Sequence, residues 1–114
     1  MPMNVDNVKS QMRKGMLEYC VLLLLGKGEY YTTDIIEQLK EANLIVVEGT
    51  LYPLLTRLKK EGVVTYRWCE STQGPPRKYY KLSPEGDEVL KELNKAWNEL
   101  AKTVVHLTAE KVSE

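Results

Sequence analysis

Apolar residues recur at every third or fourth position along most of the chain, which is the periodicity of amphipathic helices. This spacing predicts three helices in the first half of the chain, over residues 4–25, 34–42 and 48–62. Gly26 and Gly28 are suited to end the first helix and to turn the chain, and Thr32 or Thr33 can cap the second. The first half of the chain is therefore predicted to be helical.

The third helix combines an apolar stripe with a proline inside its sequence, EGTLYPLLTRLKKEG. The stripe must face the core and consists of Leu51, Leu54, Leu55 and Leu58. If Thr50 is the N-cap, Pro53 is the third helical residue, where its missing N–H costs almost nothing. If the helix begins at Glu48, Pro53 removes one backbone hydrogen bond. Gly62 is suited to a left-handed cap at the end of the helix.

The next segment changes from helical to strand-like spacing. VVTYRWCE and RKYYKL are rich in β-branched and aromatic residues, and they flank the turn-rich sequence STQGPP. We therefore expect a β-hairpin with strands over 63–70 and 77–82, joined by a long loop over 71–76.

A long helix is predicted to close the chain. Ser83 can act as its N-cap, Pro84 suits its first position, and the helix should continue to about Val112. Its apolar positions alternate by three and four, at Leu90, Leu93, Trp97, Leu100, Val104 and Leu107. This a/d seam suits pairing with a second copy of the same helix, so we expect a homodimer. Packing against the first helix of the same chain is the alternative, and both contacts can coexist.

The charges are balanced overall but unevenly distributed. Sixteen basic and sixteen acidic residues give a net charge of zero over 114 residues, the length of one domain. Residues 1–47 carry five basic and six acidic residues, residues 48–82 seven and three, and residues 83–114 four and seven. Only the middle third is basic, and it contains the third helix and the hairpin.

Several classes of function are disfavoured by the sequence. Cys20 and Cys69 lack metal-ligand spacing and His106 is the only histidine, so no metal or other cofactor is expected. No phosphate loop, catalytic triad or paired carboxylates indicate an enzyme. The longest apolar run, YCVLLLL, is too short to span a membrane, and no secretory signal is recognisable, so we expect a cytoplasmic protein.

The order of helix, helix, short helix, hairpin and helix is that of a winged helix-turn-helix with an appended dimerisation helix, a mainly α fold with a small β-hairpin (α+β). We expect a DNA-binding domain over 1–82 and a dimerisation helix over 83–114. The third helix presents an outer face without acidic residues, as contact with the DNA major groove requires, and the basic hairpin adds a second contact. The predicted contact residues are Thr50, Tyr52, Pro53, Thr56, Arg57, Lys60, Gln73, Arg77 and Lys78.

The region from the third helix to the start of the last helix resembles the PadR-type transcriptional regulators. Their pattern runs G-T-L-Y-P, R-L, E-G, R-K-Y-Y and L-[ST]-x-x-G, and the chain matches it at 49–53, 57–58, 61–62, 77–80 and 82–86. The single closing helix is typical of the short subgroup. At YYTTDII the chain departs from the usual Y-G-Y pattern of the family.

The resemblance implies a homodimeric repressor that binds an inverted-repeat operator and is released by a small hydrophobic or aromatic effector. Trp97 matches an aromatic residue that stacks planar ligands between the closing helices in multidrug-sensing members. Gly15 and Tyr19 on the first helix could face the same gap. Trp97 could equally be a bulky residue that only fills the dimer seam.

A winged helix used for protein contacts alone is the competing function, because the fold does not dictate the partner. The basic outer face of residues 50–60 favours double-stranded DNA. Binding to duplex DNA that weakens steeply with salt would distinguish the two functions. The operator sequence and the regulated genes do not follow from the sequence.

Overall fold

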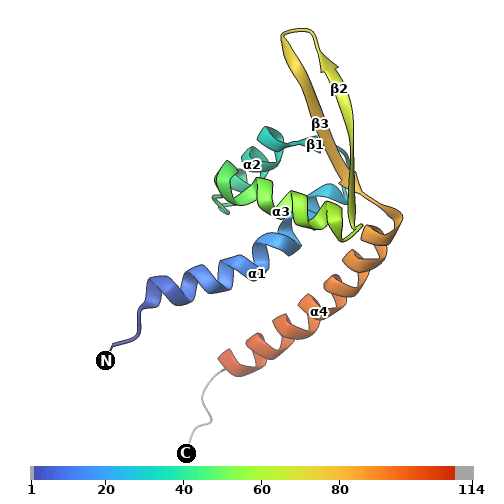
Figure 1. The fold of residues 1–114 in the computed structure, drawn as a ribbon. Helices are drawn as coiled ribbons and strands as arrows, with labels where there is room; N and C mark the ends of the chain where they lie inside the picture. Colours follow the sequence, from blue (N-terminus) through green and yellow to red (C-terminus); the bar gives the residue numbers. More distant parts are fainter. Residues whose placement is uncertain (1, 110–114) are drawn as a thin grey trace, which may run out of the picture.

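The computed structural model describes residues 2–109, which form four helices and a three-stranded antiparallel sheet (Figure 1). Along the chain the elements are α1 (Val5–Leu25), β1 (Tyr30–Tyr31), α2 (Thr32–Glu41), α3 (Glu48–Lys60), β2 (Val64–Ser71), β3 (Gly74–Leu82) and α4 (Pro84–Thr108). The strand order in the sheet is β1-β3-β2. The predicted mainly α fold with a hairpin is confirmed, with one additional short strand.

The core lies where the C-terminal half of α1 meets α2, α3 and the base of the sheet. Its largest fully buried side chains are Leu22, Ile35, Leu51, Leu55 and Leu58. Three of these belong to the apolar stripe predicted for α3, whose fourth member, Leu54, is half-buried. Burial of this stripe fixes which side of α3 faces solvent.

The second helix begins earlier than predicted. It starts at Thr32 with Tyr31 as its N-cap, and no side chain caps it, so the predicted threonine cap is wrong. Tyr30 and Tyr31 form β1, which pairs with Tyr80 and Tyr79 of β3. This strand was missed because two residues carry no periodicity of their own.

The third helix begins at Glu48, with Val47 as its N-cap, so the alternative with Thr50 as the N-cap is wrong. Pro53 is the sixth helical residue and cannot donate to the carbonyl of Gly49. Both residues are exposed, so water can satisfy that carbonyl. At the other end, Gly62 has φ +80°, which confirms the predicted left-handed cap.

We call the hairpin the wing. Its strands extend further towards the tip than predicted, and its turn is shorter than predicted. Its strands pair Cys69 with Arg77 and Ser71 with Gly74, which leaves only Thr72 and Gln73 in the turn. The predicted long loop over 71–76 is therefore wrong. Pro75 and Pro76 lie in β3 opposite a single residue of β2, at an irregularity in the register. Proline is tolerated there because a bulge leaves backbone amides unpaired.

The last helix begins as predicted, with Ser83 accepting a hydrogen bond from the amide of Gly86 at 3.0 Å and Pro84 at the first position. It ends at Thr108, because Ala109 has an extended backbone. The predicted end at Val112 lies outside the described residues.

Two helices extend away from the core. Figure 1 shows the N-terminal half of α1 and the distal part of α4 projecting on the side opposite the wing. The radius of gyration is 17.4 Å, against about 13 Å for a compact chain of this length. No helix within residues 2–109 is both long and apolar enough to cross a bilayer, and no cluster of metal-ligating side chains occurs in that range.

Candidate nucleic-acid interface

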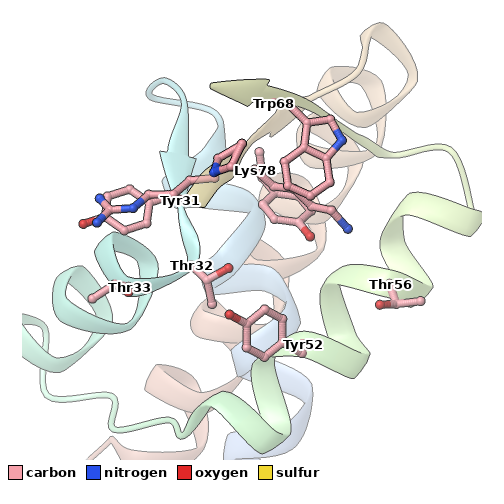
Figure 2. Close-up of a pocket in the computed structure, with 10 residues that line it drawn as sticks. Tyr31, Thr32, Thr33, Tyr52, Thr56, Trp68 and Lys78 are labelled. Atoms are coloured by element: carbon pink, nitrogen blue, oxygen red, sulfur yellow. The ribbon is translucent and has the colours of Figure 1, made fainter. Parts of the chain in front are cut away.

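A groove of about 550 Å³ lies between the wing, the start of α2 and the exposed side of α3 (Figure 2). We call it the wing groove. It is lined by Tyr31, Thr32, Thr33, Tyr52, Thr56, Trp68, Pro76, Arg77, Lys78 and Tyr80. None of these residues is acidic, two are cationic and six carry a hydroxyl group. The groove therefore presents hydrogen-bond donors and positive charge to solvent.

The third helix contributes Tyr52 and Thr56 to the wing groove. They are four residues apart, so they lie on the same side of the helix, and the buried leucines hold that side outward. Figure 2 shows both side chains on α3, with Lys78 and Trp68 of the wing above them. Tyr52 is 49% exposed, so its phenol is available to a ligand in the groove.

Strand alternation separates the two basic residues that the sequence placed together in the wing. Lys78 is paired with Trp68, and its ammonium nitrogen lies 4.5 Å from the ring centre of Tyr66 and 5.3 Å from that of Trp68. The neighbouring Arg77 points to the other face of the sheet, where its guanidinium lies 4.6 Å from the ring centre of Tyr31. Cation–π contacts thus hold Lys78 inside the groove and Arg77 at its rim.

The start of α2 closes the end of the wing groove. Thr32 is buried yet lines the groove, and Thr33 is exposed beside it. No side chain caps this helix, so no side-chain acceptor satisfies its first backbone amides, which belong to the turn that contributes Thr32 and Thr33 to the groove. The positive end of the helix dipole adds to the charge of Arg77 nearby. This corner of the groove suits an anionic group such as a phosphate.

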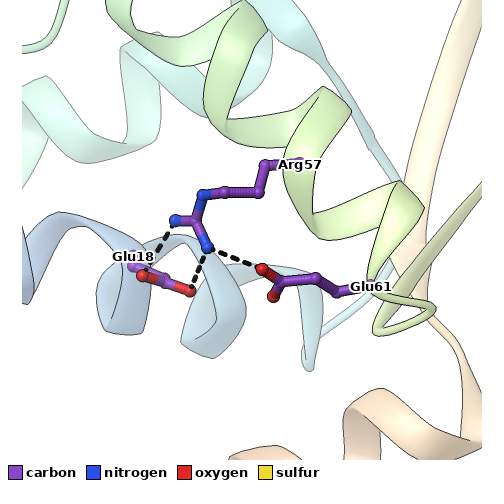
Figure 3. A network of polar contacts seen from close by, with 3 residues as sticks. All are labelled: Glu18, Arg57 and Glu61. Atoms are coloured by element: carbon purple, nitrogen blue, oxygen red, sulfur yellow. Dashed lines mark hydrogen bonds and ion pairs between the residues drawn. The ribbon is translucent and has the colours of Figure 1, made fainter.

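Arg57 is held on a different side of α3. Its guanidinium makes two contacts with the carboxylate of Glu18 on α1, at 3.0 and 3.2 Å, and one with Glu61 at 3.1 Å (Figure 3). Hydrogen bonds to Glu18 and then to Glu61 raise the pKa of Arg57 above its usual value. Arg57 therefore ties α3 to α1, and two carboxylates already compensate its charge.

The remaining predicted contact residues do not line the wing groove. Thr50 and Pro53 lie with Arg57 in a second cavity of about 550 Å³ along α1. Lys60 and Gln73 are exposed, at the end of α3 and at the turn of the wing. The single outer face predicted for α3 is thus divided into a groove side with Tyr52 and Thr56 and an α1 side with Pro53 and Arg57.

Sequence reasoning missed six lining residues of the wing groove: Tyr31, Thr32, Thr33, Trp68, Pro76 and Tyr80. In the sequence, Thr32 and Thr33 indicate only a helix cap, and Trp68 indicates only a strand. Alternation from Lys78 could have found Tyr80, which shares its face of the strand. Burial raises the pKa of the Tyr80 phenol, so its hydroxyl remains protonated over a wide pH range.

The apolar seam predicted on α4 divides into two parts. Leu90 and Leu93 pack against the core of their own chain. The distal part is exposed: Trp97 by 42%, Leu100 by 60%, Val104 by 57% and Leu107 by 76%. A second exposed apolar set, Val5, Val8 and Met12, lies on the projecting half of α1. Contiguous exposed apolar side chains of this kind are typical of an interface.

Tyr19 and Trp97, two of the predicted effector residues, do meet between α1 and α4. Their ring centres are 6.5 Å apart, and the Tyr19 hydroxyl donates a hydrogen bond to Asn94 at 2.6 Å. Gly15 and Tyr19 line a cavity of about 230 Å³ between α1, α3 and α4. Trp97 borders this region through Tyr19 and remains open to solvent.

Known proteins match this chain over most of its length. A family model described as the transcriptional regulator PadR-like family matches residues 21–92. The chain is 66% identical to a PadR-like transcription factor from Bacteroides fragilis, covering 90% of this chain and 99% of that one, with a TM-score of 0.76. A PadR-like transcriptional regulator from Bacillus cereus is 35% identical over 89% and 99% of the two chains, with a TM-score of 0.79. A PadR family regulator from Eggerthella lenta is 30% identical over 94% of each chain, with a TM-score of 0.83.

Proposed function

Because the chain belongs to the PadR-like family of transcriptional regulators, which are not enzymes, we propose that it is a homodimeric repressor that binds duplex DNA at an inverted repeat. In this proposal α3 enters the major groove, the wing follows the adjacent backbone and minor groove, and α4 pairs the two copies. The two-fold symmetry of this dimer would then match two half-sites in the DNA about one helical turn apart.

The composition of the wing groove carries this proposal. An acid-free lining with two cations, six hydroxyl groups and a helix N-terminus is complementary to a phosphate backbone. The groove also brings Tyr52 and Thr56 of α3 beside Lys78 of the wing, so one strand of DNA could contact both elements at once. Residues 1–47 and 83–114 carry no positive net charge, so the electrostatic attraction to DNA comes from residues 48–82.

The experiment that tests the function is selection of bound duplexes from a random pool, followed by affinity measurements on the selected duplex. An enriched sequence with two-fold symmetry supports the proposal, because a symmetric dimer reads the same half-site twice. No affinity for any duplex at low salt would instead favour a winged helix that binds only proteins.

Lys78→Ala is expected to weaken duplex binding and to flatten its salt dependence. Removing one phosphate contact reduces the slope of log K against log salt by about 0.9 per subunit. The matched control is Lys81→Ala, which removes the same charge from the outer face of the same strand, outside the wing groove. Fluorescence anisotropy of a labelled duplex across a salt series measures both slopes. Equal slopes for the two variants would contradict the assignment of Lys78.

We also propose that the dimer binds a planar aromatic or hydrophobic effector beside Trp97. The support is the exposed indole of Trp97, 6.5 Å from Tyr19 in a region bordered by two helices with exposed apolar side chains. Rings of this kind stack on flat apolar ligands. DNA binding and effector binding would communicate through α1, because Glu18 lies next to Tyr19 and holds Arg57 of α3.

A panel of planar aromatic compounds is expected to change the tryptophan emission of the protein by stacking on Trp97. The change should be lost in Trp97→Leu and retained in Trp68→Phe, which keeps Trp97 as the only tryptophan. Emission that responds to none of the compounds, with Trp97 intact, would count against an aromatic effector at this site.

A further inference from the structure

We propose that Trp68 determines part of the sequence specificity: its indole N–H reads A·T pairs in the minor groove beside the wing. This inference rests on the DNA binding proposed above and adds a contact that α3 does not make. It concerns a residue that is 61% exposed on a strand, where a side chain of this size normally seeks burial.

Trp68 is exposed but held in place. Its ring meets that of Tyr66 edge to face, with centres 6.2 Å apart and planes at 90°. The ammonium group of Lys78, its partner across the strands, lies 5.3 Å from the same ring. Contacts on two sides restrict the indole before any ligand arrives, so little conformational entropy is lost on binding.

The indole also lies on the side of the wing that faces α3. Trp68 lines the wing groove together with Tyr52 and Thr56, and Figure 2 shows it above these α3 residues. In the DNA complex proposed above, a duplex that seats α3 in its major groove would pass along this face of the wing. The exposed apolar sets of α1 and α4 lie at the opposite end of the molecule, so the dimer interface proposed above does not cover Trp68 (Figure 1).

The chemistry of the indole selects the base pair. Its N–H is a donor without acceptor capacity, and none of the side-chain hydrogen bonds within residues 2–109 involves it. In the minor groove A·T pairs present only acceptors, whereas G·C pairs add the donor amino group of guanine. A donor-only side chain held against the minor groove therefore favours A·T, and lysine at position 78 adds attraction to the negative potential of a narrow A·T-rich groove.

The test is a parallel duplex selection with the parent protein, Trp68→Phe and Tyr79→Phe. Phenylalanine keeps an aromatic ring at position 68 and removes the donor. Tyr79→Phe is the matched control, because it removes a donor from an aromatic residue on the other face of the same wing. The parent and the control are expected to enrich A·T at positions flanking the sequence read by α3, and Trp68→Phe is expected to lose only this flanking preference.

Substitution with inosine then tests whether Trp68 contacts the minor groove. Replacing a flanking A·T pair by G·C in the selected duplex is expected to weaken parent binding roughly tenfold, while I·C, which lacks the minor-groove amino group, should restore most of it. Trp68→Phe should bind all three duplexes within about twofold of one another, because it lacks the discriminating donor. Anisotropy of labelled duplexes at one salt concentration measures these ratios.

The outcomes separate this inference from the proposed function. If the parent selects a symmetric sequence but Trp68→Phe retains its flanking preference, or if I·C behaves like G·C, the role of Trp68 is wrong and DNA binding stands. If the parent binds no duplex at low salt, the proposed function fails and the role of Trp68 fails with it. Circular dichroism and sedimentation of each variant establish that the fold and the association state are those of the parent.

Discussion

Gly86→Ala is expected to lower the free energy of unfolding by about 3 kcal/mol, at the upper end of what overpacking a well-packed site costs. A Cβ atom at this position in the first turn of α4 would overlap the backbone carbonyl oxygen of Val63. That carbonyl cannot move aside freely, because it accepts a hydrogen bond from the amide of Ser83 at 3.1 Å. The amide of Val63 in turn donates to Leu58 at 3.1 Å. The added methyl group therefore strains the junction of α3, β2 and α4.

Urea denaturation followed by circular dichroism measures this loss, at one fixed protein concentration because association shifts apparent stability. The matched control is Gly15→Ala, where an added Cβ meets no atom within 4 Å. Alanine there should maintain the stability or raise it by about 0.5–1 kcal/mol, since Gly15 lies in a helix interior. Equal midpoints for the two variants would show that the junction relaxes without cost.

Replacing both Leu100 and Val104 by glutamate is expected to convert the dimer to a monomer and to weaken operator binding by about a thousandfold, the smallest ratio typical of specific over non-specific binding. Both side chains are exposed in the single chain and belong to the seam proposed to pair the two copies. Four carboxylates would face one another in the dimer, and their desolvation and repulsion oppose pairing. A monomer can then engage only one half-site.

Sedimentation gives the association state, and anisotropy with the selected duplex gives the affinity. The control Asn98→Glu with Lys102→Gln changes the net charge by the same amount on the other side of α4, and it should remain dimeric. If Leu100→Glu with Val104→Glu still sediments as a dimer, the pairing surface lies elsewhere, and the exposed apolar set of α1 becomes the first candidate.

The predictions that proved correct concern properties carried by neighbouring residues. The leucine stripe of α3, the left-handed cap at Gly62 and the Ser83–Pro84 start of α4 were all evident in sequence because each depends on residues within two turns of a helix. The wing was recognised from its β-branched and aromatic runs. Its turn was misjudged because Pro75 and Pro76 usually indicate a loop, and the bulge that accommodates them exists only once β2 and β3 are paired.

The candidate site was predicted in outline and corrected in detail. Tyr52, Thr56 and Lys78 are predicted from the sequence to contact DNA, and all three line one groove. Arg57 belongs to the same predicted outer face of α3, yet Glu18, which is distant in sequence, holds its guanidinium against α1. Trp68 was overlooked because nothing within its strand distinguishes a buried tryptophan from one that faces a groove.

The sequence by itself determined where the helices and the wing lie, the basic character of the middle third, and the family resemblance, because periodicity, capping and motif spacing are local. Only the tertiary structure decided that β1 exists, that Arg77 and Lys78 lie on opposite faces of the wing beside different aromatic rings, and that the start of α2 completes the groove. Each of these depends on segments that become neighbours when the core closes around Leu22, Ile35 and Leu55. These contacts form between segments that are distant in sequence and are stabilised only when all of the segments pack together in the core. They therefore cannot be predicted from any single stretch of the chain.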